Sequence, residues 1–492
     1  MTTAAPPVLS APAHGAPAAP ARTVLAQFRS KDGEPTGPPL QLPTTTTAKE
    51  LALVLNQLLA NDEPLPYTFT VDDEEILTSI DHDVLTKQHK STESTLIIEY
   101  TPQAVFRVRA VTRCGATMTG HSDAVLSVHF APDSRTVASG SGDATVRVWD
   151  LDTATPKATL KAHTNWVLSV AWSPDGNTIA SGGMDGLVCL WDARTAKGTS
   201  TKPLAVLKGH RDAVTCLAWE PMHTNAACSR LASGSRDGTV RIWDTRSRTT
   251  EFALAQHTKA ITCVKWGGEG LIYTASRDCS IKTWSASDGK LVRTLAGHGH
   301  WVNTMALSSE TLLRTGPYDH ASAGKKWSNA TEAAEVARER YRTGHKGAER
   351  LVSGSDDFTL FLWTPSASKQ ATTRMTGHQA LVNHVTFSPS GARIASASFD
   401  KSIKVWDGFT GKFLFGLRGH VGAVYQCVFS ADERLLMSAS KDSTCKVWDM
   451  RTKKLKGDLP GHADEVYAVD WAPDGERACS GSKDRSLKLW RQ

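Results

Sequence analysis

Four types of side chain recur along this sequence at regular spacings, and these types could form a catalytic or metal-binding site. Each set has a His, then a Ser or Thr, an Asp four residues after the hydroxyl, and a Trp six residues after the Asp. His, hydroxyl and carboxylate together could form a hydrolase triad, and His with Asp could bind a metal ion. The set occurs eight times, however, and this recurrence indicates that it builds the architecture. The sets are His121, Ser139, Asp143, Trp149; His163, Ser181, Asp185, Trp191; His210, Ser233, Asp237, Trp243; His257, Thr274, Asp278, Trp284; His298, Ser353, Asp357, Trp363; His378, Ser396, Asp400, Trp406; His420, Ser438, Asp442, Trp448; and His462, Ser480, Asp484, Trp490.

Each set marks one unit of an internal repeat that dominates the sequence from residue 116 onward. The units resemble WD repeats, with Gly-His at their openings and endings such as Val148-Trp149-Asp150. This resemblance implies a β-propeller of four-stranded blades, in which the four side chains form a hydrogen-bonded relay inside each blade. Such a relay supplies the donors that a buried Asp requires. Eight units that end in Trp predict eight blades.

The closure of the ring can also be predicted from the repeat. The last unit ends at Trp490, two residues before the end of the sequence, so its outer strand must come from elsewhere. Residues 116–118 precede His121 in the same way that residues 158–160 precede His163. We therefore expect residues 116–118 to supply the missing strand and to remove the open edges of a linear sheet.

The segment before the repeats has the pattern of a small α+β domain. A helical pattern of Leu and Val, which Thr46 or Thr47 can cap, lies between strand-like segments. The order of the elements resembles ubiquitin-like domains, and because no Gly-Gly pair follows the last strand, we expect docking rather than conjugation. The expected strands are 23–30, 39–43, 67–71 and 95–100.

The sequence therefore predicts a mainly β protein, an eight-bladed WD-repeat β-propeller preceded by a small α+β ubiquitin-like domain. Residues 1–22 are a tail rich in Ala and Pro, which we expect to be disordered. The ubiquitin-like domain covers residues 23–102, residues 103–115 are a linker, and residues 116–492 form the propeller.

Composition excludes several classes of protein. No run of eighteen apolar residues occurs, so we expect no membrane span. Nine Cys without a CxxC pair fit neither a disulfide framework nor a zinc module, and they favour a reducing intracellular compartment. No phosphate-binding loop, metalloprotease motif or serine-hydrolase motif is present. We therefore predict that the protein is not an enzyme and acts through its surfaces.

Charge is divided unevenly along the chain. Residues 1–104 hold 13 acidic and 6 basic residues, whereas the remainder holds 37 acidic and 50 basic residues. An acidic head on a basic body indicates two surfaces with different partners. Two interpretations of the basic body stay open, namely proximity to nucleic acid and solvation of a large surface.

The fifth unit is interrupted, because 59 residues separate its His from its Asp. The extra segment, at about residues 317–349, includes a helical pattern that Thr331 could cap. Its positive charge could contact RNA, or it could belong to a solvated helix with Glu–Arg pairs. The basic residues of this insertion are Lys325, Lys326, Arg338, Arg340 and Arg342.

Two repeat positions are expected at the top face of the propeller. They are the residue before each blade Asp and the residue three places after each His. Trp, Arg and Phe at such positions are typical anchors of interfaces, although the two Trp could instead pack against neighbouring blades. The candidates are Trp166, Arg236, Arg277, Trp301, Phe399, Lys441 and Lys483.

The whole arrangement resembles the Notchless family of large-ribosomal-subunit assembly factors. The resemblance depends on the acidic head, the junction at residues 100–113, the interrupted fifth unit, and stretches such as residues 163–168 and 458–466. It implies a non-catalytic factor of the pre-60S particle, monomeric and located in the nucleolus and nucleoplasm. The propeller would contact proteins of the particle and, as an open possibility, rRNA.

The same resemblance implies a role for one turn of the head. In this family the head docks on the metal-ion-dependent adhesion site of midasin, an AAA ATPase, through an acid in a Ser-Thr-Glu turn. Here that turn is Ser91, Thr92 and Glu93, followed by Ser94. Glu93 would bind an Mg²⁺ ion that the partner holds, since Mg²⁺ prefers oxygen ligands, and the chain would need no cofactor of its own.

Other functions remain open on the sequence alone. A WD-repeat propeller could recruit substrates to a ubiquitin ligase, with the head binding a ligase or proteasome component. This alternative predicts binding that is independent of divalent metal and no sedimentation with ribosomal precursors. A signalling scaffold is a third possibility, for which the sequence offers no separate feature.

Overall fold

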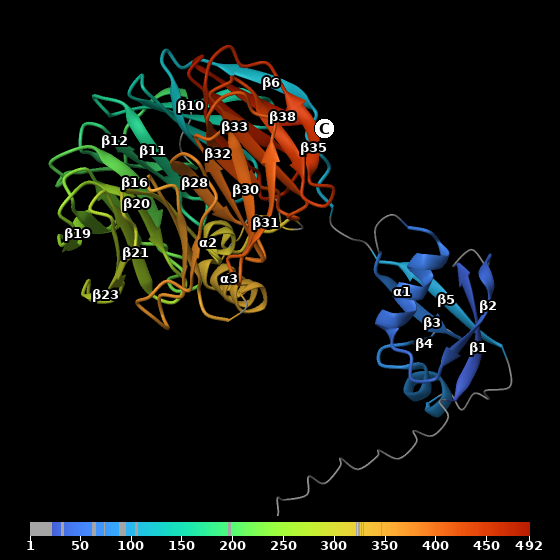
Figure 1. Cartoon of the computed structure of the whole chain (residues 1–492). Helices are drawn as coiled ribbons and strands as arrows, with labels where there is room; N and C mark the ends of the chain where they lie inside the picture. Colours follow the sequence, from blue (N-terminus) through green and yellow to red (C-terminus); the bar gives the residue numbers. More distant parts are fainter. Residues whose placement is uncertain are drawn as a thin grey trace, which may run out of the picture. The chain divides into compact units, whose positions relative to one another are not determined.

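The computed structural model describes residues 22–30, 34–61, 65–72, 74–87, 95–103, 107–194, 198–320, 322, 325, 327, 329–345 and 347–492. The chain divides into two units between Phe106 and Arg107 (Figure 1). In the described parts of the chain, no helix is long and apolar enough to span a membrane.

The first unit is a five-stranded sheet with one long helix. The strand order is β2-β1-β5-β3-β4, with β1 and β5 parallel at the centre and the other pairs antiparallel. Helix α1 and the short π-helix η1 complete the unit. The elements are β1 (Thr23–Ser30), β2 (Pro35–Pro43), α1 (Ala48–Leu58), β3 (Tyr67–Val71), β4 (Glu74–Glu75), η1 (Asp81–Thr86) and β5 (Leu96–Pro102).

Local hydrogen bonds fix the helical parts of this unit. Thr47 is the N-cap of α1, and its backbone N–H donates to Glu50 Oε2 at 2.8 Å, which completes a capping box. Leu51 and Leu55 then face the core of the sheet. Within η1, the carboxylate of Asp83 is 5% exposed, and hydrogen bonds from His82 and Thr78 hold its pKa far below the usual range. The buried charge is thus fully compensated.

The second unit contains eight sheets, each with four antiparallel strands. The first sheet contains β7 (Val125–Phe130), β8 (Thr136–Ser141), β9 (Thr145–Asp150) and β10 (Thr155–Lys161), with β14 (Gly198–Thr201) as a fifth strand. The second contains β11 (Val167–Trp172), β12 (Thr178–Gly183), β13 (Val188–Asp192) and β15 (Ala205–Leu207). The third contains β16 (Val214–Trp219), β17 (Arg230–Ser235), β18 (Val240–Asp244) and β19 (Thr249–Leu254), and the fourth contains β20 (Ile261–Trp266), β21 (Leu271–Ser276), β22 (Ser280–Ser285) and β23 (Leu291–Ala296).

The remaining four sheets follow the same plan. The fifth sheet contains β24 (Val302–Leu307), β25 (Leu351–Ser355), β26 (Leu360–Trp363) and β27 (Thr373–Met375). The sixth contains β28 (Val382–Phe387), β29 (Arg393–Ser398), β30 (Ser402–Asp407) and β31 (Phe413–Arg418). The seventh contains β32 (Val424–Phe429), β33 (Leu435–Ser440), β34 (Cys445–Asp449) and β35 (Lys454–Leu459), and the eighth contains β36 (Val466–Trp471), β37 (Ala478–Ser482), β38 (Ser486–Arg491) and β6 (Arg113–Thr119).

The last sheet joins the two ends of the second unit. Strand β6 pairs with β38, with Met118 opposite Leu487 and Ala116 opposite Leu489, which is the pairing that the repeat spacing predicts. The first strands of successive sheets are neighbours, and β36 of the last sheet packs beside β7 of the first. One apolar cluster includes Val125 and Leu487 from these two sheets, so burial of apolar surface also stabilises this junction. This arrangement is a WD-repeat propeller (Figure 1).

The interruption of the fifth repeat folds into two helices between β24 and β25. Helix α2 (Glu310–Thr315) begins before the expected insertion, and α3 (Ala330–Gly344) lies within it. The N-cap of α3 is Asn329, whose side chain accepts the Thr331 N–H at 3.0 Å, so the prediction that Thr331 caps this helix was wrong. An Asn side chain can accept this bond because the backbone of an N-cap residue lies outside the helix.

Candidate docking surface

The eight repeated sets form buried hydrogen-bonded relays. In every set the His Nδ1 lies 2.7–3.1 Å from the Asp carboxylate, and the His Nε2 lies 2.7–2.9 Å from the hydroxyl oxygen. The Trp indole N–H donates to the same hydroxyl at 2.7–2.9 Å. Every one of these hydroxyls is therefore buried and has two hydrogen-bond partners, which supports the structural interpretation of the sets.

The charge state of a relay follows from its surroundings. Burial lowers the pKa of His121, against the opposing attraction of Asp143. Burial alone would raise the pKa of Asp143, but hydrogen bonds from His121, Thr145 and the Ser122 N–H hold it well below the usual range. Asp143 is thus a fixed anion that receives donors from two loops of its repeat and orders these loops.

One cavity brings four of the predicted interface residues together. Arg236, Arg277, Trp301 and Phe399 line a cavity of about 370 Å³. They come from four successive repeats: Arg236, Arg277 and Phe399 each precede the Asp of their repeat, and Trp301 is three places after the His of its repeat. Asn303 also lines the cavity and donates to Asp356 Oδ1 at 2.6 Å.

The guanidinium groups give this cavity a positive side. Arg277 lies over the ring of Trp301, with its Cζ 4.5 Å from the ring centroid. Within the described residues, neither Arg236 nor Arg277 has a carboxylate within ion-pair distance. Phe399 forms an edge contact with Tyr425 at a centroid distance of 5.6 Å. The cavity can therefore hold an anionic group beside an apolar one, a combination suited to a protein partner.

The other predicted top-face residues do not line this cavity. Trp166 is 48% exposed, so it is not packed away against a neighbouring blade. Lys441 lies 4.0 Å from Glu465, and Lys483 lies 3.4 Å from Asp464. The face therefore carries paired Lys residues in addition to the two Arg residues.

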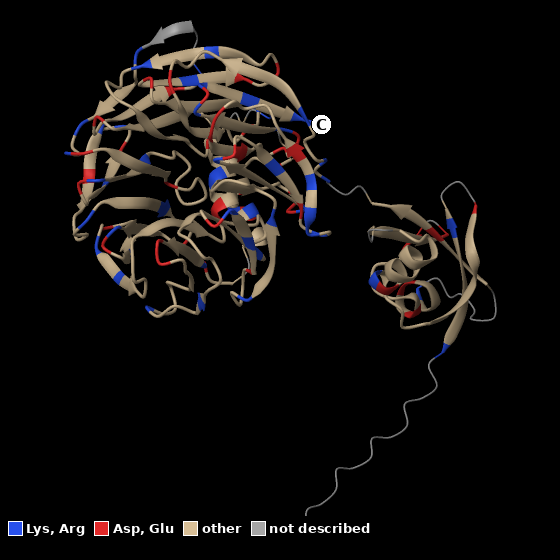
Figure 2. Cartoon of the chain, turned by 45° about the horizontal axis from the view of Figure 1, so that its top comes forward, with Lys and Arg blue, Asp and Glu red and all other residues tan. Residues whose placement is uncertain are grey.

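The basic insertion does not present one basic face. Arg340 is half-buried and donates to the Gly316 carbonyl, and Lys325 lies over the ring of Trp327 with its Nζ 3.9 Å from the centroid. Arg338 and Arg342 are exposed, whereas Lys326 lies outside the described residues. Figure 2 shows acidic and basic residues interspersed over the second unit.

Packing against another repeat explains which face of α3 is buried. Ala333, Ala334 and Ala337 lie against Met222 and Cys228 in the long loop of the third repeat. This loop of the third repeat is therefore the surface on which α3 packs. Small Ala side chains at helical spacing permit this close approach.

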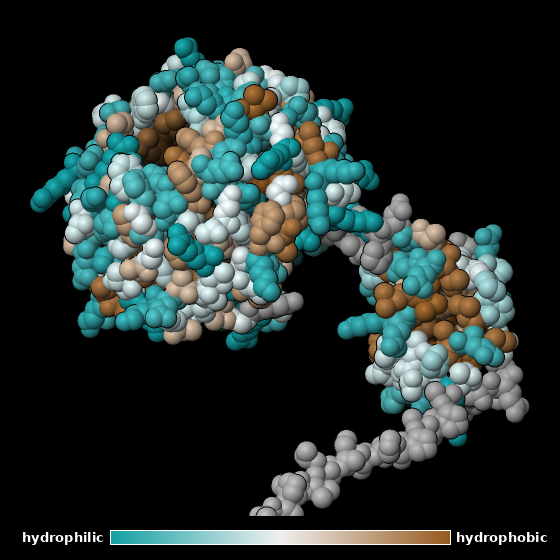
Figure 3. All heavy atoms as spheres, in the orientation of Figure 1, coloured by the Kyte–Doolittle hydropathy of each residue, from teal (hydrophilic) through white to brown (hydrophobic). Residues whose placement is uncertain are grey.

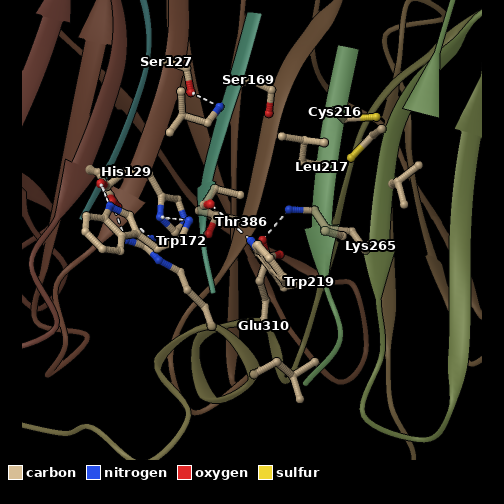
Figure 4. Close-up of a pocket in the computed structure, with 18 of the residues that line it drawn as sticks. Ser127, His129, Ser169, Trp172, Cys216, Leu217, Trp219, Lys265, Glu310 and Thr386 are labelled. Carbon is tan, nitrogen blue, oxygen red and sulfur yellow. Dashed lines mark hydrogen bonds and ion pairs between the residues drawn. The ribbon is translucent and has the colours of Figure 1, made fainter. Parts of the chain in front are cut away.

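A second cavity, of about 350 Å³, lies among the first strands of the sheets, and α2 lies at one side of it (Figure 4). Glu310 of α2 forms an ion pair with Lys265 of β20, and Arg314 donates to both carboxylate oxygens of Asp470 on β36. Helix α2 thus bridges two distant repeats. His384 lies in the same cavity, where burial and the nearby Lys265 lower its pKa to about 4.

Sequence reasoning missed these bridging residues. Lys265 and Asp470 occupy the same position of their first strands, where five of the other six repeats carry Ala, Thr or Val and the first carries His129. A charge at a first-strand position where most repeats carry a small or apolar residue is the signal that could have found them. Their partners lie 45 and 156 residues away, and no spacing rule connects them.

The predicted metal-reaching turn of the head cannot be placed. Ser91, Thr92, Glu93 and Ser94 lie outside the described residues. The sequence continues from them into β5, the central strand of the first unit.

Comparisons with known proteins agree with this architecture. The WD domain, G-beta repeat, matches residues 112–150, 154–192, 201–244, 248–285, 369–407, 411–449 and 453–491. The NLE (NUC135) domain matches residues 24–83. A crystal structure of the computationally designed Ika8 protein resembles 77% of this chain and all of its own, with a TM-score of 0.61 and 25% identity. The protein is therefore a WD-repeat propeller with an NLE domain at its N-terminus.

Relatives identify the family. Protein Notchless of Drosophila melanogaster is 49% identical over 75% of each chain. The Notchless protein homolog of Arabidopsis thaliana is 52% identical over 80% of this chain and 82% of its own. Ribosome assembly protein 4 of Saccharomyces cerevisiae is 46% identical over 80% of this chain and 79% of its own. The chain belongs to the Notchless family, whose members are non-catalytic.

Proposed function

We propose that this protein is an assembly factor of the large ribosomal subunit, acting on the pre-60S particle in the nucleolus and nucleoplasm. The observation that carries the proposal is the 46% identity to Ribosome assembly protein 4 over 80% of this chain. The division of the chain into two compact units supports a role in which the two units bind different partners. The factor acts as a monomer and needs no cofactor of its own.

The head, in this proposal, is a ubiquitin-like domain that docks on the metal-ion-dependent adhesion site of midasin. Its sheet, with parallel β1 and β5 at the centre and α1 packed on the core, supports the ubiquitin-like assignment. Glu93 completes the coordination shell of the Mg²⁺ ion that midasin holds, since a carboxylate oxygen is a preferred ligand of this ion. Ser91, Thr92 and Ser94 hold the turn.

The propeller is the anchor on the particle. We interpret its eight sheets as eight blades of a closed ring, which the neighbouring first strands and the β6–β38 pairing support. The bridge from α2 to Lys265 and Asp470 adds contacts across the ring. A ring held in this way deforms little under load.

Force then passes between the two units. ATP-driven movement of midasin pulls on the head, and the chain transmits the pull to the anchored propeller. Because the propeller holds the particle, the pull remodels the contacts around it.

The cavity with Arg236 and Arg277 is the proposed contact with acidic groups of the particle. Replacing both residues with Glu should reduce co-sedimentation of the full chain with pre-ribosomal particles by about tenfold, because repulsion replaces attraction at the interface. The matched control replaces the exposed Lys161 and Arg246 with Glu, which changes the net charge equally. An equal loss in both variants would mean that net charge, and not this cavity, governs the association.

A further inference from the structure

Strand β31 is an open edge of the second unit. It is the last strand of the sheet β28-β29-β30-β31, and its pairing with β30 places Phe413 opposite Trp406 and Leu417 opposite Ile403. Among the described residues no strand pairs with its other side. The N–H and C=O groups on that side are free to accept a further strand.

This edge exposes large apolar side chains. Phe413 is 52% exposed, Leu414 is 43% exposed, and Phe409 in the preceding turn is 48% exposed. Leu417, by contrast, is buried and fixes the strand to its sheet. Figure 3, in the orientation of Figure 1, shows hydrophobic atoms bordered by hydrophilic ones in the region where Figure 1 labels β31.

Two other outer strands carry charged residues, a feature that usually protects an edge. Strand β35 has Lys454, Lys456 and Asp458, and β19 has Glu251. Charged residues on an edge disfavour pairing with a foreign strand. Strand β31 has only Arg418 at its last position.

One outer edge of this molecule already accepts an extra strand. Residues 198–201 form β14, which pairs in parallel with β10 outside the first sheet. The outer edge of a sheet in this unit is therefore accessible to a strand from another part of a chain.

Positive charge around β31 indicates what kind of strand this edge would bind. The ammonium group of Lys404 lies 5.3 Å from the ring centroid of Phe413, and that of Lys453 lies 5.3 Å from the centroid of Phe415. Lys412 and Arg418 stand at the two ends of the strand and are exposed. None of these four cations has a carboxylate within ion-pair distance among the described residues. A strand that covers this edge gains most if it carries acidic residues.

We propose that β31 is a docking edge for a β-strand of another protein, one with apolar side chains flanked by Asp or Glu. Backbone hydrogen bonds extend the sheet, and Phe413 and Leu414 contact the apolar side chains of the added strand. The four cations pair with the flanking carboxylates. No residue of β31 lines the cavity with Arg236 and Arg277.

The test uses a fluorescent peptide of alternating Val and Thr with two Glu at each end, and a second peptide with Lys in place of Glu. We expect the full chain to bind the Glu peptide at least about tenfold more tightly, measured by fluorescence anisotropy. Leu414→Lys should weaken this binding by about tenfold, because it adds an unpaired charge within the apolar edge. Leu455→Lys on β35 is the matched control, since Leu455 is 44% exposed, and it should leave binding unchanged.

Several results would overturn the proposal. They are no binding of the Glu peptide, equal binding of both peptides, and an equal effect of Leu414→Lys and Leu455→Lys. Concentration-dependent dimerisation of the full chain that Leu414→Lys abolishes would instead assign the edge to a second copy of this chain. Because both Leu residues are exposed, thermal melting of the two variants should match that of the unsubstituted protein and exclude misfolding.

Discussion

Replacing Glu93 with Ala should weaken the binding of the full chain to the adhesion-site domain of midasin by about a hundredfold, measured by isothermal titration calorimetry. Removing one partner of a desolvated charged contact costs about 2–5 kcal/mol, and a hundredfold corresponds to about 2.7 kcal/mol. Glu93→Asp keeps the charge but shortens the side chain, so we expect an intermediate loss. Removal of Mg²⁺ with a chelator should abolish the binding of the unsubstituted protein.

The control for this prediction lies in the same unit. Glu75 on β4 is exposed, and Glu75→Ala makes the same change in charge as Glu93→Ala. If Glu75→Ala weakens binding as much as Glu93→Ala does, the negative charge of the head as a whole, and not ligation of the metal by Glu93, would account for the binding. Binding that persists in chelator would favour the ligase-adaptor alternative.

Replacing Asp470 with Ala should lower the free energy of unfolding by about 3–5 kcal/mol, the range for breaking a buried ion pair on one side. The Asp470 side chain is 5% exposed, and it accepts hydrogen bonds from both terminal nitrogens of Arg314 and from the Phe130 N–H at 2.8 Å. Its loss leaves the Arg314 charge and a buried donor without an acceptor. The midpoint of urea unfolding measures the effect.

A second variant separates the ion pair from the backbone contact. Asp470→Asn keeps an oxygen for the Phe130 N–H but removes the negative charge, so we expect a smaller loss of stability. Equal stability of Asp470→Ala and the unsubstituted protein would mean that α2 does not brace the ring.

The repeating relays could be predicted from sequence because one hydrogen-bond requirement recurs at fixed spacing. In the first repeat, a buried Asp143 needs donors, and His121 supplies one from a loop 22 residues earlier. Such a requirement constrains residue type and spacing together, which makes it visible without a structure. The pairing of β6 with β38 could also be predicted from the repeat, because the last repeat lacks an outer strand of its own and the segment before the first repeat matches one.

The contacts of the insertion could not be predicted in this way. Which face of α3 is buried depends on the loop that carries Met222, more than a hundred residues earlier. Arg340 therefore turns inward although its spacing was compatible with a basic surface. The cavity with Arg236 and Arg277 is an intermediate case, because equivalent loop positions identified these two residues, whereas Asn303 lies on a first strand and occupies neither of the two expected interface positions.

Cutting the connection between the two units is the most direct test of force transmission from the head to the propeller. Pre-ribosomal particles would carry either the intact chain or a chain cut by a protease at a site inserted between residues 106 and 107, where the two units meet in sequence. Release of the factor would be followed after addition of midasin and ATP. We predict that the cut propeller stays on the particle while the head still binds midasin. Equal release of the intact and the cut chain would contradict force transmission from the head to the propeller.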